Sequence, residues 1–298
     1  MTWICPVCTA TLTQIGRCLS CANNHSFDLA KEGYTNLLLV NQKNSKAPGD
    51  SKLMLSARRD FLQAGYYQPL ADKIIEMLRP YLLGSDSYFL DCGCGEGYYS
   101  EQIYRALMPN IRGIDIARDG VRLAAKRFKS LLLADAANAQ FAVASSFNLP
   151  LPEHQLDAIL QVFAPVSESE LRRVLKSDGV YCDVSPGPKH FTQLKQQIYR
   201  EAREHEMPVL ASGFTLLSEE RVSFEIELKH NIDLQNLLMM TPLYWKGSVT
   251  AKTRLMAMDS FTLSIDFVLR LYCPNIIDNT FNCGIDSALD CATETVSI

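Results

Sequence analysis

A glycine-rich segment in the first third of the chain restricts its fold more than any other feature. The apolar run Phe89–Cys92 leads directly into the turn Gly93–Gly97. Tyr98–Leu107 then has helical periodicity, and Asp115 ends the next apolar run, 20 residues after Gly95. A strand, a glycine turn, a helix and an acid at the end of the second strand are the parts of a Rossmann-like nucleotide site.

The region from residue 59 to about residue 272 alternates apolar runs with amphipathic ones, which predicts α/β architecture with a doubly wound parallel sheet. Strands are predicted at Tyr88–Asp91, Ile111–Asp115, Phe141–Ala144, Leu156–Val162, Val180–Ser185, Val222–Leu228 and Phe261–Leu271. Helices are predicted at residues 59–83 with a break near Pro69, Tyr98–Leu107, Arg118–Phe128, Glu168–Leu175 and His190–Glu204. Ligands of such folds bind at the carboxyl ends of the strands.

The glycine turn indicates a nucleoside ligand. Its glycines let the backbone turn tightly and approach a bound molecule, and the helix that follows adds N–H groups without partners. Asp115 can accept hydrogen bonds from the two ribose hydroxyls of an adenosine. A dinucleotide would need its pyrophosphate over the turn, where Asp91 and Glu96 disfavour an anion. We therefore expect S-adenosylmethionine, whose sulfonium and ammonium groups suit an acidic loop, rather than NAD. The expected site comprises Asp91, Gly93, Gly95, Glu96, Gly97 and Asp115.

Four cysteines within the first 21 residues, followed by a histidine, indicate a zinc site. Cys5-x-x-Cys8 and Cys21-x-x-x-His25 have the spacing of zinc ligands. Four protein ligands leave no open position, so the ion is expected to be structural. Cys18-x-x-Cys21 also has the spacing of a zinc knuckle, so an all-cysteine site of Cys5, Cys8, Cys18 and Cys21 remains the alternative.

The length of 298 residues suits one large domain with a small module. No run approaches the roughly 18 consecutive apolar residues of a spanning helix, and the N-terminus has no signal-peptide pattern. We therefore expect a cytoplasmic protein without a membrane partner. The predicted organisation is a zinc-binding module at 1–35, a linker at 36–58, the α/β domain at 59–272 and a disordered tail at 273–298. The formal net charge is −4, and the basic run within Arg118–Lys129 predicts either a solvated helix face or a surface that tracks phosphates.

Several further segments, taken together with the zinc pattern and the glycine turn, resemble one family of known enzymes. They are residues 27–34, Pro48–Ser51, Ala57–Arg59, Gly65–Leu70, Ala144–Ser146, Ala164–Pro165, Pro186–His190 and Met240–Pro242. Over about residues 1–272 the chain resembles the RlmA family of bacterial ribosomal RNA methyltransferases, and within it the Gram-negative branch. The resemblance implies a class I methyltransferase domain behind a zinc ribbon. It also implies methylation of guanine N1 in a 23S ribosomal RNA hairpin, at guanine 745 in that branch.

The resemblance assigns roles to individual residues. It places the family's cofactor contacts on Tyr67, on the stretch Gly95–Gly97 and on His190. It leaves Cys18 as an extra thiol. The family's zinc ligands fall on Cys5, Cys8, Cys21 and His25.

The chemistry of guanine N1 raises two further questions. The N1 proton must leave before or during methyl transfer, and the sequence offers Asp183 and His190 as acceptors without selecting between them. The base must be unpaired or flipped to expose this edge, and aromatic residues can then stack on it. The candidates are Phe163, Tyr244 and Trp245.

Two other functions fit the same residues. One is a methyltransferase for a small molecule, with the ribbon as a lid. The other is a non-enzymatic zinc adaptor with a degenerate nucleotide-binding fold, which the intact acids and glycines of the turn argue against. For the RNA enzyme, we expect the ribbon and the Arg58-Arg59 face to bind the hairpin. A homodimer would offer two such clefts, and the sequence leaves the oligomeric state open.

Overall fold

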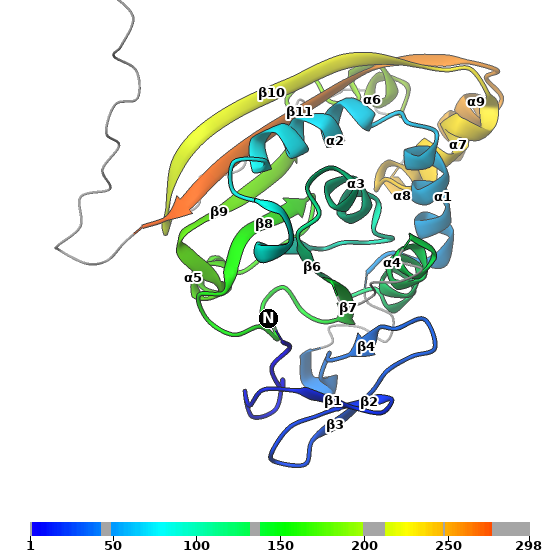
Figure 1. Cartoon of the computed structure of the whole chain (residues 1–298). Helices are drawn as coiled ribbons and strands as arrows, with labels where there is room; N and C mark the ends of the chain where they lie inside the picture. Colours follow the sequence, from blue (N-terminus) through cyan, green and yellow to red (C-terminus); the bar gives the residue numbers. More distant parts are fainter. Residues whose placement is uncertain (1, 43–48, 132–137, 199–211, 247, 276–298) are drawn as a thin grey trace, which may run out of the picture.

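The computed structural model describes residues 2–42, 49–131, 138–198, 212–246 and 248–275. An eight-stranded sheet forms the body of the molecule, and a three-stranded ribbon made by the N-terminal residues lies against it (Figure 1). Among the described residues, no helix combines the length and the apolar character that crossing a membrane requires.

The large sheet has the strand order β10-β11-β9-β8-β5-β6-β7-β4. Its strands are β4 (Thr35–Asn36), β5 (Tyr88–Cys92), β6 (Asn110–Asp115), β7 (Ala139–Val143), β8 (Leu156–Val162), β9 (Leu175–Pro186), β10 (Phe214–Leu228) and β11 (Phe261–Pro274). The run from β4 to β9 is parallel, and β11 and β10 add an antiparallel edge that arches over the body (Figure 1). The ribbon consists of β1 (Thr13–Ile15), β2 (Cys18–Ser20) and β3 (Ser26–Asp28).

Nine α-helices connect or flank these strands in the part of the chain that is described. They are α1 (Lys52–Gln63), α2 (Gln68–Leu78), α3 (Tyr98–Leu107), α4 (Arg118–Leu131), α5 (Glu168–Val174), α6 (Thr192–Ile198), α7 (Asn231–Met239), α8 (Leu243–Lys246) and α9 (Val249–Met256). The strand order reverses at β5, which has β6 on one side and β8 on the other. This switch point opens a crevice at the carboxyl ends of the strands.

The two faces of the sheet carry separate hydrophobic clusters, because successive side chains of a strand point to opposite faces. On β5, Phe89 packs with α1 to α4, whereas Leu90 packs into the second cluster with α5 and the ribbon. The ribbon contributes Trp3 and Leu12 to that second cluster. The ribbon therefore shares one core with a face of the large sheet.

Polar contacts add to this packing. The Ile4 N–H donates to the Pro150 carbonyl over 3.0 Å, and the guanidinium of Arg112 lies 5.8 Å from the centre of the Trp3 ring. β4 extends the large sheet by pairing with β7, directly after the ribbon. Residues 1–35 and 59–272, predicted as separate units, are thus joined by a continuous interface.

Most predicted elements are present, and two have exact bounds: α3 and β8. α1 begins at Lys52, inside the predicted linker, because the Ser51 hydroxyl caps it by accepting the Met54 N–H over 3.3 Å. The predicted helix from His190 begins only at Thr192, because Phe191 has a positive φ of 61° that no helix accommodates. Its predicted part beyond Ile198 lies outside the described residues up to 211.

The C-terminal region differs in three ways. β10 begins at Phe214 rather than at the predicted Val222, and three helices that were not predicted, α7 to α9, precede β11. β11 continues to Pro274 and pairs with β10 to its end, so Cys273 and Pro274 belong to the sheet and not to a tail. The rest of the predicted tail, residues 276–298 with Cys283 and Cys291, lies outside the described residues.

Candidate active site and metal centre

A cavity of about 1210 Å³ lies at the switch point of the sheet. Segments far apart in the sequence form its wall, and most of those behind the family resemblance are among them. They include Gly49–Asp50, Gly93–Glu96, Asp115–Ala117, Ala144–Phe147, Gln161–Pro165, Asp183–Pro186 and Met240–Leu243. The cavity can hold a cofactor and part of a substrate together, because drug-sized ligands occupy roughly 300–1,000 Å³.

The glycine turn comes close to its neighbours. Gly93 has φ of 87°, and a Cβ placed there would lie 2.6 Å from the Cβ of Ala164. Any other residue at this position would therefore have a strained backbone and would clash with the side chain of Ala164. Gly93 and Gly95 line the cavity; Gly97, the residue just before α3, does not, and it packs against Ala124 of α4.

Asp115 connects the glycine turn to the start of α4. One carboxylate oxygen accepts the Gly95 N–H over 2.9 Å, and the other accepts the Ala117 N–H over 2.7 Å. Each carboxylate oxygen has a second lone pair, so both can still accept a hydroxyl from the cavity. Asp115 therefore offers two acceptor atoms at the wall of the cavity.

Asp91 lies beneath the turn and does not line the cavity. Its carboxylate is 2% exposed and accepts a short hydrogen bond from the Ser100 hydroxyl. Burial raises the pKa of Asp91 to about 7, although the bond from Ser100 favours the ionised form. Asp91 thus supports the loop from behind, whereas the sequence predicted that it would meet the ligand.

Asp91→Asn is expected to remove one component of the pH dependence of stability. Because the folded-state pKa is raised from 3.8 to about 7, the contribution of Asp91 is full below pH 4 and is lost as the pH rises through 7. Between pH 5 and pH 7 wild type should lose about 2 kcal/mol relative to the variant. Urea unfolding of both proteins at each pH measures this difference. Parallel curves would contradict the assignment.

Glu96 lines the cavity, but its carboxylate pairs with Arg127 of α4. Arg127 also donates to the Glu96 carbonyl over 3.2 Å and pairs with Glu101 of α3. Burial raises the pKa of Glu96, and the charge of Arg127 opposes that shift. The negative charge that the sequence ascribed to the loop is thus balanced within the protein at Glu96.

Tyr67 and His190, which are far apart in the sequence, both line the cavity. Both rings pack on Phe267, with centroids 5.0 Å and 4.7 Å away. The Asp266 N–H donates to Nδ1 of His190 over 3.3 Å, so a neutral ring carries its proton on Nε2. This geometry presents an N–H donor rather than a proton acceptor.

Asp266 fixes the loop that carries His190. Its carboxylate accepts the Lys189 N–H and two bonds of 2.7 Å from Arg221. Burial raises the pKa of Asp266, but the bonds from Arg221 and Ser223 outweigh it and lower the pKa to about 2. The antiparallel strands β10 and β11, which carry Arg221 and Asp266, therefore position His190 in the cavity.

Arg58 does not share an outward face with Arg59, although the sequence analysis predicted that the two residues form one face that binds RNA. It points into the cavity, pairs with Asp50 and donates to the Met240 carbonyl over 3.3 Å. Only Arg59 remains outside, where it pairs with Asp60. Asp50 and Gln161 also line the cavity, although neither was assigned a role from the sequence: Asp50 appeared only within the segment Pro48–Ser51, and Gln161 only within a predicted strand.

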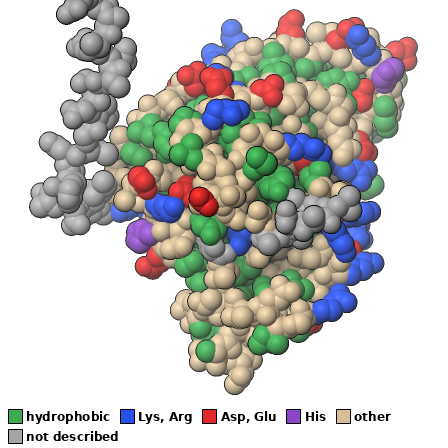
Figure 2. All heavy atoms as spheres, viewed as in Figure 1, with side chains coloured by type: hydrophobic (Ala, Val, Ile, Leu, Met, Phe, Trp, Pro, Cys, Tyr) green, Lys and Arg blue, Asp and Glu red, His purple; other side chains and the backbone are tan. Residues whose placement is uncertain are grey.

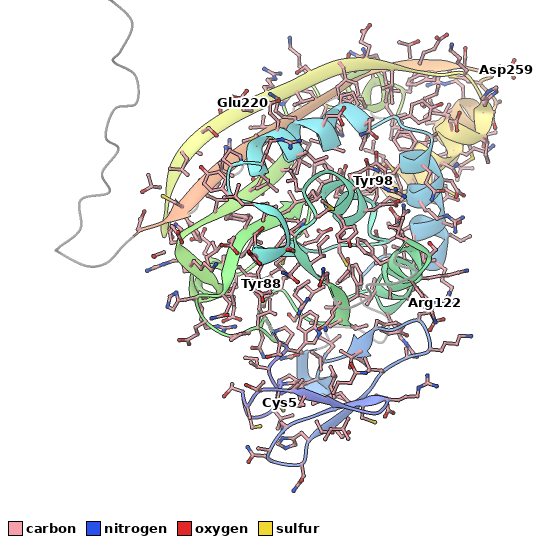
Figure 3. The ribbon with its side chains drawn as sticks, viewed as in Figure 1. Cys5, Tyr88, Tyr98, Arg122, Glu220 and Asp259 are labelled. Carbon is pink, nitrogen blue, oxygen red and sulfur yellow. The ribbon has the colours of Figure 1, made fainter. Side chains whose placement is uncertain are left out.

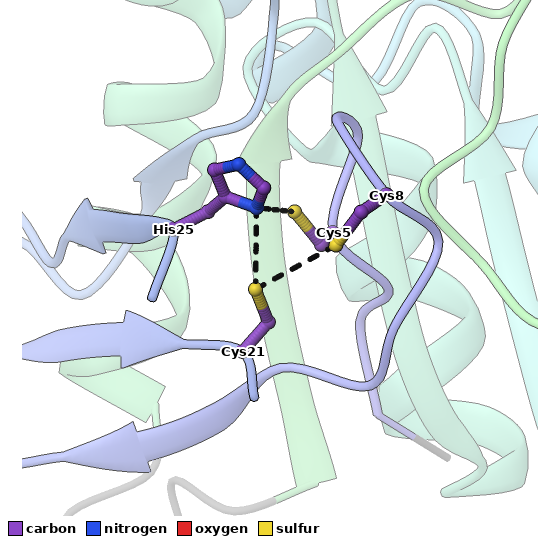
Figure 4. Close-up of side chains that lie close together, drawn as sticks. All are labelled: Cys5, Cys8, Cys21 and His25. Atoms are coloured by element: carbon purple, nitrogen blue, oxygen red, sulfur yellow. Dashed lines mark hydrogen bonds between the residues drawn. The ribbon is translucent and has the colours of Figure 1, made fainter. Parts of the chain in front are cut away.

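Four residues of the ribbon meet at a second centre: Cys5, Cys8, Cys21 and His25 (Figure 4). Their ligand atoms all lie within 4.8 Å of one another. The Cys8 and Cys21 sulfurs are 3.7 Å apart, and Nδ1 of His25 lies 3.6 Å from Cys5 and 3.4 Å from Cys21. These are edges of a tetrahedron with bonds of about 2.0–2.3 Å to a central ion, as zinc requires.

Cys18 lies outside this cluster, and its thiol donates to the Asp28 carboxylate over 3.2 Å. The all-cysteine alternative therefore does not fit the geometry. A hydrogen bond from Asn23 is the largest of several that lower the pKa of Cys8 to about 6, which favours the thiolate that a metal binds.

Comparison with known proteins agrees with both centres. Residues 3–46 match the model of the RlmA N-terminal zinc ribbon, and residues 89–179 match a methyltransferase domain. A Micromonospora griseorubida protein, provisionally named a 23S rRNA (guanine-N1)-methyltransferase, is 31% identical over 65% of this chain and 68% of its own length. The chain belongs to the RlmA family.

Two other relatives cover more of the RlmA-family chain. YxjB of Bacillus subtilis has the same provisional name and is 29% identical over 88% of this chain and 93% of its own. The 23S rRNA (guanine(748)-N1)-methyltransferase of Streptomyces fradiae is 29% identical over 89% and 95%.

This RlmA-family chain is an enzyme that uses S-adenosylmethionine and carries one structural zinc ion. Its residues fit both groups. Three thiols and an imidazole are a zinc donor set, and they leave no open coordination position. The cavity at the switch point has an acid for a ribose at Asp115 and a close backbone approach at Gly93 and Gly95.

Proposed function

We propose that this enzyme methylates N1 of a guanine in a 23S ribosomal RNA hairpin. The names of the three relatives support the reaction and the RNA. The observation that carries the proposal is that Asp115, the expected ribose acceptor, and the exposed aromatic ring of Phe163 line the same cavity.

Cofactor contacts are assigned within this proposal to the residues that line the cavity. They are Tyr67, Gly93, Gly95, Glu96, Asp115 and His190, with Asp91 and Gly97 shaping the turn from behind. The zinc ligands are assigned to Cys5, Cys8, Cys21 and His25. Bound S-adenosylmethionine supplies an activated methyl group, and the protein orients it and excludes water.

Phe163 is the strongest candidate for stacking on the target base. It follows β8, its side chain is 49% exposed, and its φ of 56° is unusual for a bulky residue. The Phe163 N–H donates to the Val184 carbonyl over 3.2 Å, which holds the strained backbone. Strain of this kind is concentrated at functional sites. Tyr244 instead lies under the Lys252 ammonium, 5.3 Å from it, and the side chain of Trp245 lies outside the described residues.

The proton of guanine N1 needs an acceptor or a path to solvent. Asp183 and His190 both line the cavity. His190 presents a donor when neutral, so Asp183 is better suited to accept a proton. Burial raises the pKa of Asp183, while Arg270 and Tyr181 oppose that shift, and a raised pKa makes a carboxylate a stronger base.

A stripe of cations on α4 supports an RNA partner. Arg118, Arg122, Lys126 and Lys129 are exposed at helical spacing on one side of α4, whereas Arg127 points inward. Figure 2 shows Lys and Arg side chains along the margin of the molecule between α4 and the ribbon, and Figure 3 places Arg122 there. Lys129 donates to the Lys31 carbonyl of the loop that follows β3 over 3.1 Å, so the stripe continues onto the N-terminal segment. Its spacing suits successive phosphates of an RNA hairpin.

The proposal predicts a single labelled nucleoside. Purified enzyme, radiolabelled S-adenosylmethionine and unmodified 23S RNA should yield label in 1-methylguanosine after nuclease digestion. Transfer should weaken steeply as salt rises, because binding releases counterions from the phosphates. No label in RNA, with cofactor binding intact, would favour a small-molecule substrate, and no cofactor binding would favour the adaptor.

Guanine 745 is the proposed target, on the resemblance to the Gram-negative branch. The Streptomyces relative is named for position 748. Primer extension on the labelled RNA separates the two, since a methyl group on N1 blocks base pairing and stops the polymerase at the modified nucleotide.

A further inference from the structure

The ion pair between Arg58 and Asp50 lies inside the cofactor cavity, where neither residue has a role in the site described so far. Arg58 comes from the middle of α1, and Asp50 lies just before the Ser51 cap of the same helix. Gly49, with φ of 82°, presses the chain against Ala117, and a Cβ there would lie 2.7 Å from the Cβ of Ala117. This contact holds Asp50 beside the turn that follows Asp115.

The guanidinium of Arg58 lies over the glycine turn. Its Nη1 is 3.9 Å from the position that a Cβ of Gly95 would take. Burial raises the pKa of Asp115 and Glu96, and the nearby charge of Arg58 opposes both shifts. Arg58 therefore lines the same cavity as Asp115, Glu96 and Tyr67 and lies close enough for its charge to act on all three.

A cofactor bound with its ribose at Asp115 extends its amino-acid end across this turn. That end carries an α-carboxylate, for which a planar guanidinium is the preferred partner. Asp50 already supplies one carboxylate to Arg58, so the guanidinium is oriented to receive one. Among the described residues Arg58 pairs with Asp50 and donates to the Met240 carbonyl, and a guanidinium has five N–H donors.

The geometry points to Arg58 as the residue that binds the α-carboxylate of S-adenosylmethionine. When the cofactor is absent, the carboxylate of Asp50 pairs with the same guanidinium. The inference rests on S-adenosylmethionine being the cofactor. It assigns no role in RNA binding or in methyl transfer. The expected effect of Arg58 is confined to the binding of the α-carboxylate of S-adenosylmethionine.

Calorimetry with two ligands tests the inference on the full-length protein. S-adenosylmethionine has the carboxylate, and decarboxylated S-adenosylmethionine lacks only that group. Arg58→Gln should weaken binding of the first about 10- to 100-fold, the range of a charge-assisted hydrogen bond, and leave the second unchanged. Arg58→Lys keeps the positive charge but not the planar guanidinium, so it should lose less affinity for S-adenosylmethionine than Arg58→Gln does.

The next residue provides a matched control. Arg59 is on the same helix, pairs with Asp60 and does not line the cavity, so Arg59→Gln should change neither affinity. Equal losses of both ligands in Arg58→Gln would show that Arg58 acts by holding the Met240 carbonyl, and unchanged affinities would place the carboxylate elsewhere. Either result overturns the inference while methyl transfer to RNA stands. Failure of wild type to bind S-adenosylmethionine would overturn the cofactor assignment itself.

Discussion

Asp115→Ala is expected to lower affinity for S-adenosylhomocysteine by about 1,000-fold. Two hydroxyl bonds to an ionised acceptor contribute roughly 1.5–3 kcal/mol each, and both are lost together. The variant also leaves the N–H groups of Gly95 and Ala117 without their acceptor, which loosens the turn that the cofactor contacts. Isothermal calorimetry measures the affinity, and adenosine as a second ligand isolates the ribose, because it lacks the amino-acid end.

Asp119→Ala is the matched control for Asp115. It lies four residues later on α4, does not line the cavity, and interacts only loosely with Lys52 and Arg122, at 4.0 Å and 3.7 Å. It should bind S-adenosylhomocysteine as wild type does. If Asp115→Ala retained affinity within about threefold of wild type, the ribose would not be held at the end of β6.

Removal of zinc should unfold the ribbon and destabilise the rest of the molecule. Structural zinc contributes about 10–16 kcal/mol of apparent binding free energy in small zinc modules, far more than three short strands supply. Because Trp3 and Leu12 pack into the second cluster, their loss uncovers Leu151 and the face of the sheet around Leu90. We expect a lower melting temperature and rapid proteolysis within residues 1–35 after chelation, and the same from Cys21→Ser.

Cys18→Ser separates metal binding from general damage to the ribbon. Cys18 lies in the same hairpin as Cys21 but contacts Asp28 rather than the cluster, and serine can donate the same hydrogen bond. This variant should bind one zinc ion per chain, as elemental analysis measures, and melt close to wild type. A Cys21→Ser protein that kept one zinc ion and the wild-type melting temperature would refute the assigned ligand set.

The parts of the fold that the sequence predicts well are those set by local pattern. α3 begins after a glycine turn and β8 is a short apolar run between polar ends, so both are readable without tertiary information. The first half of β10 was missed because residues 215–221, which follow the buried Phe214, are mostly exposed and lack alternation; their strand conformation comes from pairing with β11. β9 was shortened because Lys176–Gly179 looks like a turn, whereas in the sheet it forms an irregularity within a strand that begins at Leu175.

The candidate site divides in the same way. The turn at Gly93 and the acid at Asp115 were found from spacing, because they are close in sequence and their chemistry is specific. The inward direction of Arg58 could not be found, since only the packing of α1 against α7 decides which way that side chain points. For Glu96, the sequence predicted a carboxylate in the glycine turn but not the ion pair that neutralises it, because its partner, Arg127, comes from α4.

The shared core of ribbon and sheet has a consequence for the order of synthesis. Ile4 and the strand β4 leave the ribosome first, yet their partners, Pro150 and β7 (Ala139–Val143), are translated more than 100 residues later. All four zinc ligands are present once residue 25 has emerged. Metal capture can therefore shape the nascent N-terminus before its hydrophobic partner exists, and the newly made body of the enzyme later folds onto a surface that is already in place.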